Sequence, residues 1–233
     1  MSDLTELRTP PNIWEVQNPI RLQGERRRAE ITVSLLRPKG DERILDAGCG
    51  EGYQMSYLVE RCAQVIGLDL SVERLKQAKN KVGSVDLVCA SSDRLPFRPQ
   101  IFDKVMCLEL LEHLNEPRKT ILETESVLKE RGTLVVSVPY KQDIVATQCI
   151  HCGKLTPLWG HLHSFDERKL DSLLPSNLVT VKRIHTGTLV MAYPLFAFLP
   201  TKVWKPLDDL FKWLPYNKPS WLITKILKRG GNR

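Results

Sequence analysis

A glycine-rich stretch preceded by a carboxylate is the clearest candidate for binding a small molecule. Residues 45–53 read LDAGCGEGY. Glycines let a backbone turn sharply and approach a ligand closely, as in nucleotide-binding turns. A dinucleotide fingerprint needs glycine where Tyr53 stands, and the Gly-Lys-Ser/Thr of a P-loop is absent. Asp46 would repel a pyrophosphate, so the turn favours a cationic ligand without phosphate.

Two further acidic positions follow the next expected strands. Asp69 ends an apolar run, and a carboxylate there can accept hydrogen bonds from two ribose hydroxyls. Ser92 and Asp93 follow the third run and could meet an adenine amino group. Each acid alone could be a helix cap or an exposed loop residue. Three acids after successive strands converge on one crevice, which predicts S-adenosylmethionine (SAM), a nucleoside with an amino group and a sulfonium.

Cysteines and histidines between residues 149 and 163 form a second candidate site. Cys149 and Cys152 have the spacing of half a zinc site, and with His161 and His163 they could complete one tetrahedral, structural zinc. The H-x-H spacing differs from that of zinc fingers, and His151 is a substitute ligand. The alternative is a polar lid over an acceptor pocket, with His161 or His163 touching the substrate.

Short buried strands alternate with helices in the first half of the chain. Apolar runs between turn residues predict the strands, and Ser71 predicts a helix cap. The expected strands are residues 43–46, 64–69, 85–89, 102–108 and 133–138, and the expected helices are residues 25–36, 53–61, 72–81 and 117–129. This order predicts an α/β, Rossmann-like, doubly wound fold with a mostly parallel sheet. The acids and glycines would lie where its strands end.

The alternation stops after residue 139. Residues 140–165 form an insert that holds the cysteines and histidines, and residues 166–174 read as a helix. Residues 179–185 and 189–193 are expected to form a terminal antiparallel pair. We therefore expect one domain over residues 1–200, with the insert as a lid or zinc-binding segment, and a basic, aromatic, helical extension over residues 201–233.

Residues 44–139 resemble the small-molecule branch of the class I SAM-dependent methyltransferases. The stretches that carry the resemblance are LDAGCGEGY (45–53), VIGLDLS (65–71), ASSDRLPF (90–97), FDKVMCLELLEHL (102–114) and GTLVVSVP (132–139). The resemblance implies a seven-stranded sheet whose last strand is antiparallel. It also implies a SAM site made by Asp46, Gly48, Cys49, Gly50, Asp69, Leu70, Ser92, Asp93 and Glu109, with Asp46 and the glycines at the methionine end, Asp69 at the ribose, and Leu70, Ser92 and Asp93 at the adenine.

The acceptor is less defined than the donor. Methyl transfer to a hydroxyl needs its proton removed, and His113 is the first candidate base, with Glu112, His161, His163 and Tyr140 behind it. The alternative is that His113 only shapes the pocket. We expect a hydroxyl, or a carbon or nitrogen nucleophile, on a small or lipid-linked acceptor. A non-catalytic SAM-binding module on the same scaffold is the alternative function.

The net charge of +7 is concentrated in the extension. Its only acids are Asp208 and Asp209, while Trp204, Trp213 and Trp221 lie among its lysines. A basic, Trp-bearing amphipathic helix suits an anionic membrane surface, and the alternative is a helix packed on the domain. The N-terminus lacks a signal-peptide pattern, so we expect a cytoplasmic protein that could sit peripherally at a membrane. Leu108-Glu109-Leu110-Leu111, in place of an Asn/Asp-Pro-Pro-Tyr/Phe stretch, argues against a nucleic-acid acceptor.

Overall fold

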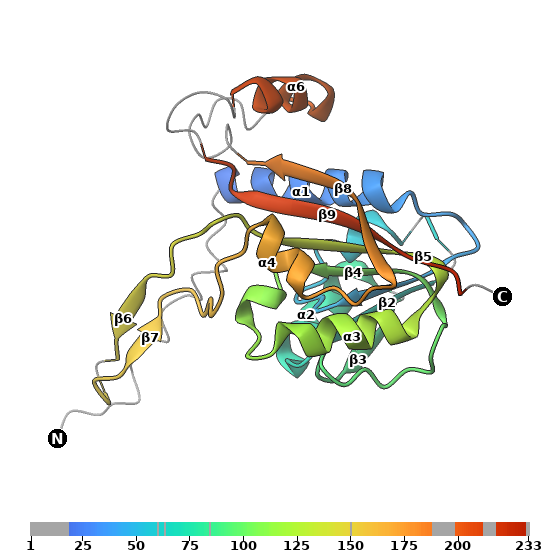
Figure 1. The fold of residues 1–233 in the computed structure, drawn as a ribbon, viewed down its shortest axis with the longest axis horizontal. Helices are drawn as coiled ribbons and strands as arrows, with labels where there is room; N and C mark the ends of the chain where they lie inside the picture. Colours follow the sequence, from blue (N-terminus) through green and yellow to red (C-terminus); the bar gives the residue numbers. More distant parts are fainter. Residues whose placement is uncertain are drawn as a thin grey trace.

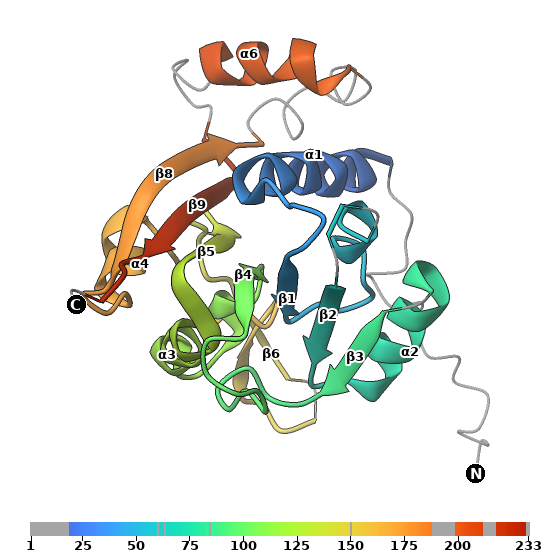
Figure 2. The ribbon, with the colours of Figure 1, turned by 90° about the vertical axis from the view of Figure 1, so that its right-hand side faces the viewer.

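The computed structural model describes residues 19–59, 61–62, 64–83, 85–149, 151–187, 199–211 and 218–231. Their core is a seven-stranded sheet in the order β3-β2-β1-β4-β5-β9-β8 (Figures 1 and 2). Strands β1 to β5 pair in parallel, and β9 is antiparallel to both of its neighbours, β5 and β8. The strands are β1 (Arg43–Ala47), β2 (Gln64–Asp69), β3 (Asp86–Cys89), β4 (Phe102–Leu108), β5 (Leu128–Pro139), β8 (Leu178–Thr186) and β9 (Trp221–Lys228). The predicted α/β fold is confirmed.

Helices cover both faces of the sheet, as Figure 2 shows. One apolar cluster takes its side chains from α1 (Pro19–Leu36), the 3-10 turn η2 (Met55–Tyr57), α2 (Val72–Val82) and α6 (Thr201–Phe211). The other takes them from α3 (Pro117–Val127), the 3-10 turn η3 (Leu111–His113) and α4 (Glu167–Ser172). The sheet is therefore buried between two layers, which explains its nearly continuous apolar strands.

Several local predictions match the structure closely. Strands β2 and β4 have the predicted bounds. The Ser71 hydroxyl accepts a hydrogen bond from the Arg74 amide at 3.3 Å and caps α2, and the Asp166 carboxylate accepts one from the Lys169 amide at 2.8 Å and caps α4. The expected helix over residues 53–61 is instead the single turn η2.

The extension differs most from its prediction. Only α6 is helical within its described part, and Trp221–Lys228 is strand β9 of the central sheet. The partner of β8 is therefore β9, while the expected strand at residues 189–193 lies outside the described residues. No helix in the described part of the chain is long and apolar enough to cross a bilayer.

The lysines of β9 have partners inside the fold. The Lys225 ammonium donates to the Leu35 carbonyl at 2.8 Å, and the Lys228 ammonium donates to the carbonyls of Glu125 and Leu128 at 2.7 and 2.9 Å. Lysines commonly bind the unpaired carbonyls at helix ends in this way. This positive charge stabilises the fold, and the reading of residues 201–233 as a helical tail is corrected.

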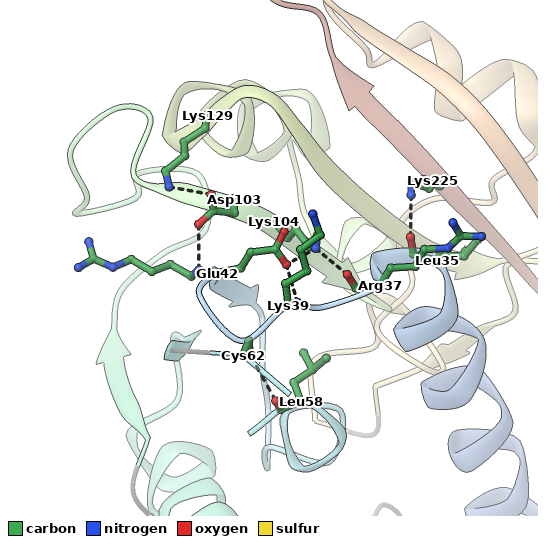
Figure 3. A network of polar contacts seen from close by, with 11 residues as sticks. Leu35, Arg37, Lys39, Glu42, Leu58, Cys62, Asp103, Lys104, Lys129 and Lys225 are labelled. Atoms are coloured by element: carbon green, nitrogen blue, oxygen red, sulfur yellow. Dashed lines mark hydrogen bonds and ion pairs between the residues drawn. The ribbon is translucent and has the colours of Figure 1, made fainter. Parts of the chain in front are cut away.

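A second polar network holds the amino ends of the strands (Figure 3). The Lys104 ammonium pairs with Glu42 and donates to the Arg37 carbonyl at 2.9 Å. The Asp103 carboxylate accepts from the Arg43 amide at 2.9 Å and from the Lys129 ammonium at 2.7 Å. These contacts stabilise the amino ends of the strands, which lie opposite the predicted ligand site at their carboxyl ends.

The insert leaves the body as an arm (Figure 1). Strands β6 (Ala146–Gln148) and β7 (Leu155–Pro157) pair as an antiparallel hairpin. Large apolar side chains on and beside the hairpin are more than a third exposed: Ile144, Val145, Leu155, Leu158, Trp159 and Leu162. The arm then returns to the domain at residues 160–163.

Candidate functional site

The glycine-rich turn has the geometry that its sequence predicts. Gly48 and Gly50 have φ values of +81° and +52°, in the left-handed region that glycine adopts without strain. The amides of Gly48 and Cys49 donate to the Leu68 carbonyl at 2.7 and 2.9 Å. A Cβ on Gly48 would lie 2.9 Å from the Leu110 side chain, whereas one on Gly50 would meet nothing within 4 Å. Gly48 is therefore needed for packing, and Gly50 borders open space.

The Asp69 carboxylate organises two turns at once. One oxygen accepts from the Gly50 amide at 2.9 Å, and the other accepts from the Ser71 amide at 2.8 Å. Each carboxylate oxygen keeps a lone pair for a further donor. Leu70 beside it is 72% exposed. An acceptor next to an exposed apolar side chain is the arrangement that a ribose and an adenine ring require.

Asp46 is buried at the end of β1. It is 2% exposed, and its Oδ2 has no hydrogen-bond partner among the described residues. Burial raises the pKa of Asp46 to about 8; the Asp69 charge adds to the rise, and Arg28 opposes it. An unsatisfied buried carboxylate is costly, and the ammonium of a methionine group would satisfy it. The residues present therefore fit SAM.

Two predicted adenine and pocket residues are engaged within the protein. The Ser92 hydroxyl is buried and shares a hydrogen bond of 3.1 Å with Thr120 of α3. The Glu109 carboxylate accepts from Ser137 at 2.8 Å and from the Trp221 indole at 3.1 Å, and it pairs with Arg28 at 3.1 Å. These contacts indicate that Ser92 and Glu109 support the walls of the site. Asp93, in contrast, is exposed at the rim.

A second group of side chains lies beyond the end of β4. One ligand atom each from Glu112, His113 and His161 lies within 4.8 Å of the other two. The imidazole rings of His113 and His161 are 4.7 Å apart, edge to face. Glu112 is 1% exposed, and neither carboxylate oxygen has a hydrogen-bond partner in the described part of the chain.

Burial controls the protonation of this group. It lowers the pKa of His113, and it lowers the pKa of His161 to about 4, with the charge of His113 adding to the effect. Burial and then the Glu109 charge raise the pKa of Glu112 well above its usual range. Both imidazoles are therefore neutral near pH 7, as a general base or a metal ligand must be.

The glycine-rich turn at Gly48–Gly50, called the donor turn below, is adjacent to the group of Glu112, His113 and His161. Leu110, which meets the Gly48 turn, lies one residue before η3, the turn that carries Glu112 and His113. The charge of Arg28 acts on both Asp46 and Glu112. The arrangement places the glycine-rich turn beside groups that could accept a proton or bind an ion.

The predicted zinc ligands do not come together. Cys149 and Cys152 lie in the hairpin arm, whereas the His161 ring contacts Gln142 Oε1 at 2.7 Å and the His163 ring contacts the Leu114 carbonyl at 2.9 Å. Glu112, His113 and His161 form the single metal-competent group of three found among the described residues. The four-ligand zinc prediction is corrected because the chain folds its histidines back onto η3 and leaves the cysteines outside.

Tyr140, the remaining candidate base, points elsewhere. Its hydroxyl donates to Glu167 at 3.2 Å and its ring packs on His185. The sequence predicts Glu112, His113 and His161 as separate candidate bases and carries no signal that joins them. Their sequence signal is only an acid and a histidine after a strand, because the partner histidine is distant along the chain.

Comparisons with known proteins agree with the geometry of the donor turn. Residues 45–136 match the family model of a methyltransferase domain. The chain is 28% identical over 199 residues to an uncharacterized protein of Methanocaldococcus jannaschii, which covers 82% of this chain and 80% of that protein. It is 35% identical over 101 residues to a ubiquinone biosynthesis O-methyltransferase of Idiomarina loihiensis. That match spans 41% of this chain and 42% of the relative, so it covers less than half of either protein.

A solved structure shares the fold over most of its length. N-methyltransferase NodS of Bradyrhizobium japonicum, in complex with S-adenosylhomocysteine, superposes with a TM-score of 0.60 at 15% identity. The match covers 94% of this chain and 93% of NodS. At this identity the likeness establishes the fold.

Proposed function

The chain carries a methyltransferase domain of the class I SAM-dependent family, and from that premise we propose that it methylates a hydroxyl group on a small acceptor with an apolar or lipid-linked portion. SAM, when bound, supplies an activated methyl group, so the protein must align the acceptor and exclude water. The Gly48–Gly50 turn, Asp46 and Asp69 would hold the donor. Residues beyond β4 and in the arm would hold the acceptor.

The observation that carries this proposal is the Glu112–His113–His161 group beside the donor turn. A hydroxyl must lose its proton during methyl transfer, and this requires a base or another activating group near the sulfonium. The Nδ1 of His113 faces the Gly160 carbonyl at 3.1 Å, so its Nε2 is the atom left to take a proton. In the simplest version of the mechanism His113 is the base, as its position in the sequence predicts.

The arm supports an apolar portion on the acceptor. Leu158, Trp159 and Leu162 are each at least 40% exposed and flank His161 in the chain. Exposed apolar patches mark sites that bind apolar ligands, membranes or partners. The name of the Idiomarina loihiensis relative describes an O-methyltransferase, which also favours an oxygen acceptor. Trp204, Lys225 and Lys228 are engaged within the fold and are not free to bind a membrane surface. Any contact with a membrane would therefore be made by the arm rather than by residues 201–233.

The test is a transfer assay with methyl-labelled SAM and a panel of hydroxylated aromatic acceptors, with and without an alkyl chain. Each acceptor is matched by its O-methylated form and by an amine analogue. We expect label in the hydroxylated acceptors, more in the alkylated ones, and none in the O-methylated forms. Label in the amines alone would contradict the oxygen acceptor. SAM binding with no labelled product across the panel would favour the non-catalytic module.

A further inference from the structure

We propose that Glu112, His113 and His161 bind one divalent transition-metal ion at the acceptor side of the site. Two imidazoles and one carboxylate are a ligand set that suits zinc and iron(II). The three ligand atoms already lie within 4.8 Å of one another, so small side-chain movements would complete the site. The site shares His161 with the predicted zinc site but uses neither cysteine of the arm.

Hydrogen bonds orient both histidines as metal ligands are oriented. The Nδ1 of His113 lies 3.1 Å from the Gly160 carbonyl oxygen, and the Nδ1 of His161 lies 2.7 Å from Gln142 Oε1. Both partners are acceptors, so each Nδ1 carries the proton and each Nε2 presents a lone pair. Histidine ligands are typically fixed by such a bond from the other ring nitrogen.

Glu112 provides the third ligand, a buried carboxyl group that a cation would bind. Its carboxylate is buried, and both oxygens lack a hydrogen-bond partner in the described part of the chain. Arg28, whose charge reaches Glu112, makes its ion pairs with Glu25 and Glu109. A buried polar group without a hydrogen-bond partner is unfavourable, and coordination to a divalent ion would satisfy it.

The arm is fastened to η3 in a way that holds the third ligand in place. Besides the Gly160 contact with His113, the Leu162 amide donates to the Glu112 carbonyl at 2.7 Å. The His163 ring contacts the Leu114 carbonyl at 2.9 Å. Three contacts on both sides of His161 therefore fix the segment, and preorganised ligands are what a metal site requires.

The role of the ion rests on the proposed function. Three protein ligands leave a coordination position for an acceptor hydroxyl, and a bound zinc lowers the pKa of a coordinated water to about 7. The acceptor would lose its proton to solvent, its oxygen would bond the methyl carbon as the sulfur–carbon bond breaks, and S-adenosylhomocysteine would leave. The ion changes no oxidation state. His113 would then act as a ligand rather than as the base.

The test measures metal binding first, without activity. The full chain is stripped with a chelator and titrated with Zn²⁺ and Co²⁺ by calorimetry and absorption. We expect one ion per chain and a cobalt spectrum without thiolate charge transfer. Mutation of a residue that only hydrogen-bonds to a metal ligand typically weakens metal affinity roughly 10–100-fold. The Glu112→Gln and His161→Ala variants, which each remove a ligand, should weaken metal affinity by more than that. Binding of S-adenosylhomocysteine serves as their folding check.

A Cys152→Ser variant is the matched control, since it removes one thiol of the predicted cysteine site and leaves the three proposed ligands intact. Unchanged binding in this variant supports the site. No ion bound, or binding lost only with Cys152→Ser, would overturn it. Metal binding with no transfer to any hydroxyl keeps the metal site and rejects the proposed function, whereas full transfer by the stripped protein keeps the function and rejects the role of the metal.

Discussion

The amino-terminal region, residues 43–139, and the carboxy-terminal region, residues 140–231, are assembled in different ways. In the first, the glycine-rich turn and Asp69 lie at the ends of neighbouring parallel strands. Each is held by hydrogen bonds within its own turn or to the adjacent strand. In the second, His161 reaches its neighbours Glu112 and His113 only because the arm folds back. Local patterns therefore identify the proposed donor site, whereas long-range packing creates the proposed acceptor site.

The largest effect should come from the carboxy-terminal region. Trp204 of α6 is 1% exposed, packs in the same apolar cluster as α1, and lies under the Arg27 guanidinium at 4.2 Å. A Trp204→Ala substitution should lower the free energy of unfolding by about 3–5 kcal/mol, measured by urea denaturation. If α6 were an appended tail, this substitution would cost no more than Val203→Ala, whose side chain is 48% exposed.

The same contrast explains which parts of the fold were predictable. Strands β2 and β4 are apolar runs between turn residues, so their bounds follow from the sequence. Strand β9 is also largely apolar, but Lys225 and Lys228 made it resemble a solvated basic tail. Their partners are carbonyls near the ends of α1 and α3, and such partners are visible only after folding.

The candidate site divides in the same way. The geometry of Gly48, Gly50 and Asp69 depends on one turn and its neighbour, so spacing is sufficient to predict where they lie. Ser92 and Glu109 occupy the expected positions, but their side chains turn to Thr120 and Arg28. Side-chain direction at a strand end depends on packing partners that the local sequence does not contain.

The second prediction tests the amino-terminal region. Asp69→Ala removes the acceptor for the amides of Gly50 and Ser71 as well as the expected ribose contact. We expect the Kd for S-adenosylhomocysteine to rise roughly 100-fold, about 2.7 kcal/mol, by calorimetry. The exposed Asp93 makes a matched control, and Asp93→Ala should change the Kd only a few-fold. Equal losses for both variants would refute the central role of Asp69.

The third prediction concerns pH and the buried Asp46. Its folded-state pKa of about 8 lies above the value in an unfolded chain. Its contribution to stability is complete at pH values below the unfolded pKa and is lost as the pH rises toward 8. Relative to Asp46→Asn, the wild type should therefore lose about 2–3 kcal/mol of unfolding free energy between pH 5 and pH 7.

Denaturation of the ligand-free protein at both pH values measures this difference. The exposed Asp41 gives the control, since Asp41→Asn should leave the slope with pH unchanged. If the unfolding free energy changed equally with pH in the wild type and in Asp46→Asn, Asp46 would be ionised in the folded protein from pH 5 to pH 7. The donor site would then hold a stable anion before its ligand arrives, and the amino-terminal region would be less strained than its burial indicates.

The smallest effect compares two lysines on one strand. The Lys228 ammonium is 5% exposed, donates to two carbonyls and pairs with the Glu125 carboxylate at 2.8 Å, whereas the half-buried Lys225 ammonium donates to one carbonyl. Lys228→Met should lower the free energy of unfolding by about 2 kcal/mol and Lys225→Met by about 1 kcal/mol, because the loss follows the number of buried acceptors left unpaired. Urea denaturation of both variants measures the difference. Equal, negligible losses would mean that these lysines are solvated, and the carboxy-terminal region would then be joined to the sheet by its apolar side chains alone.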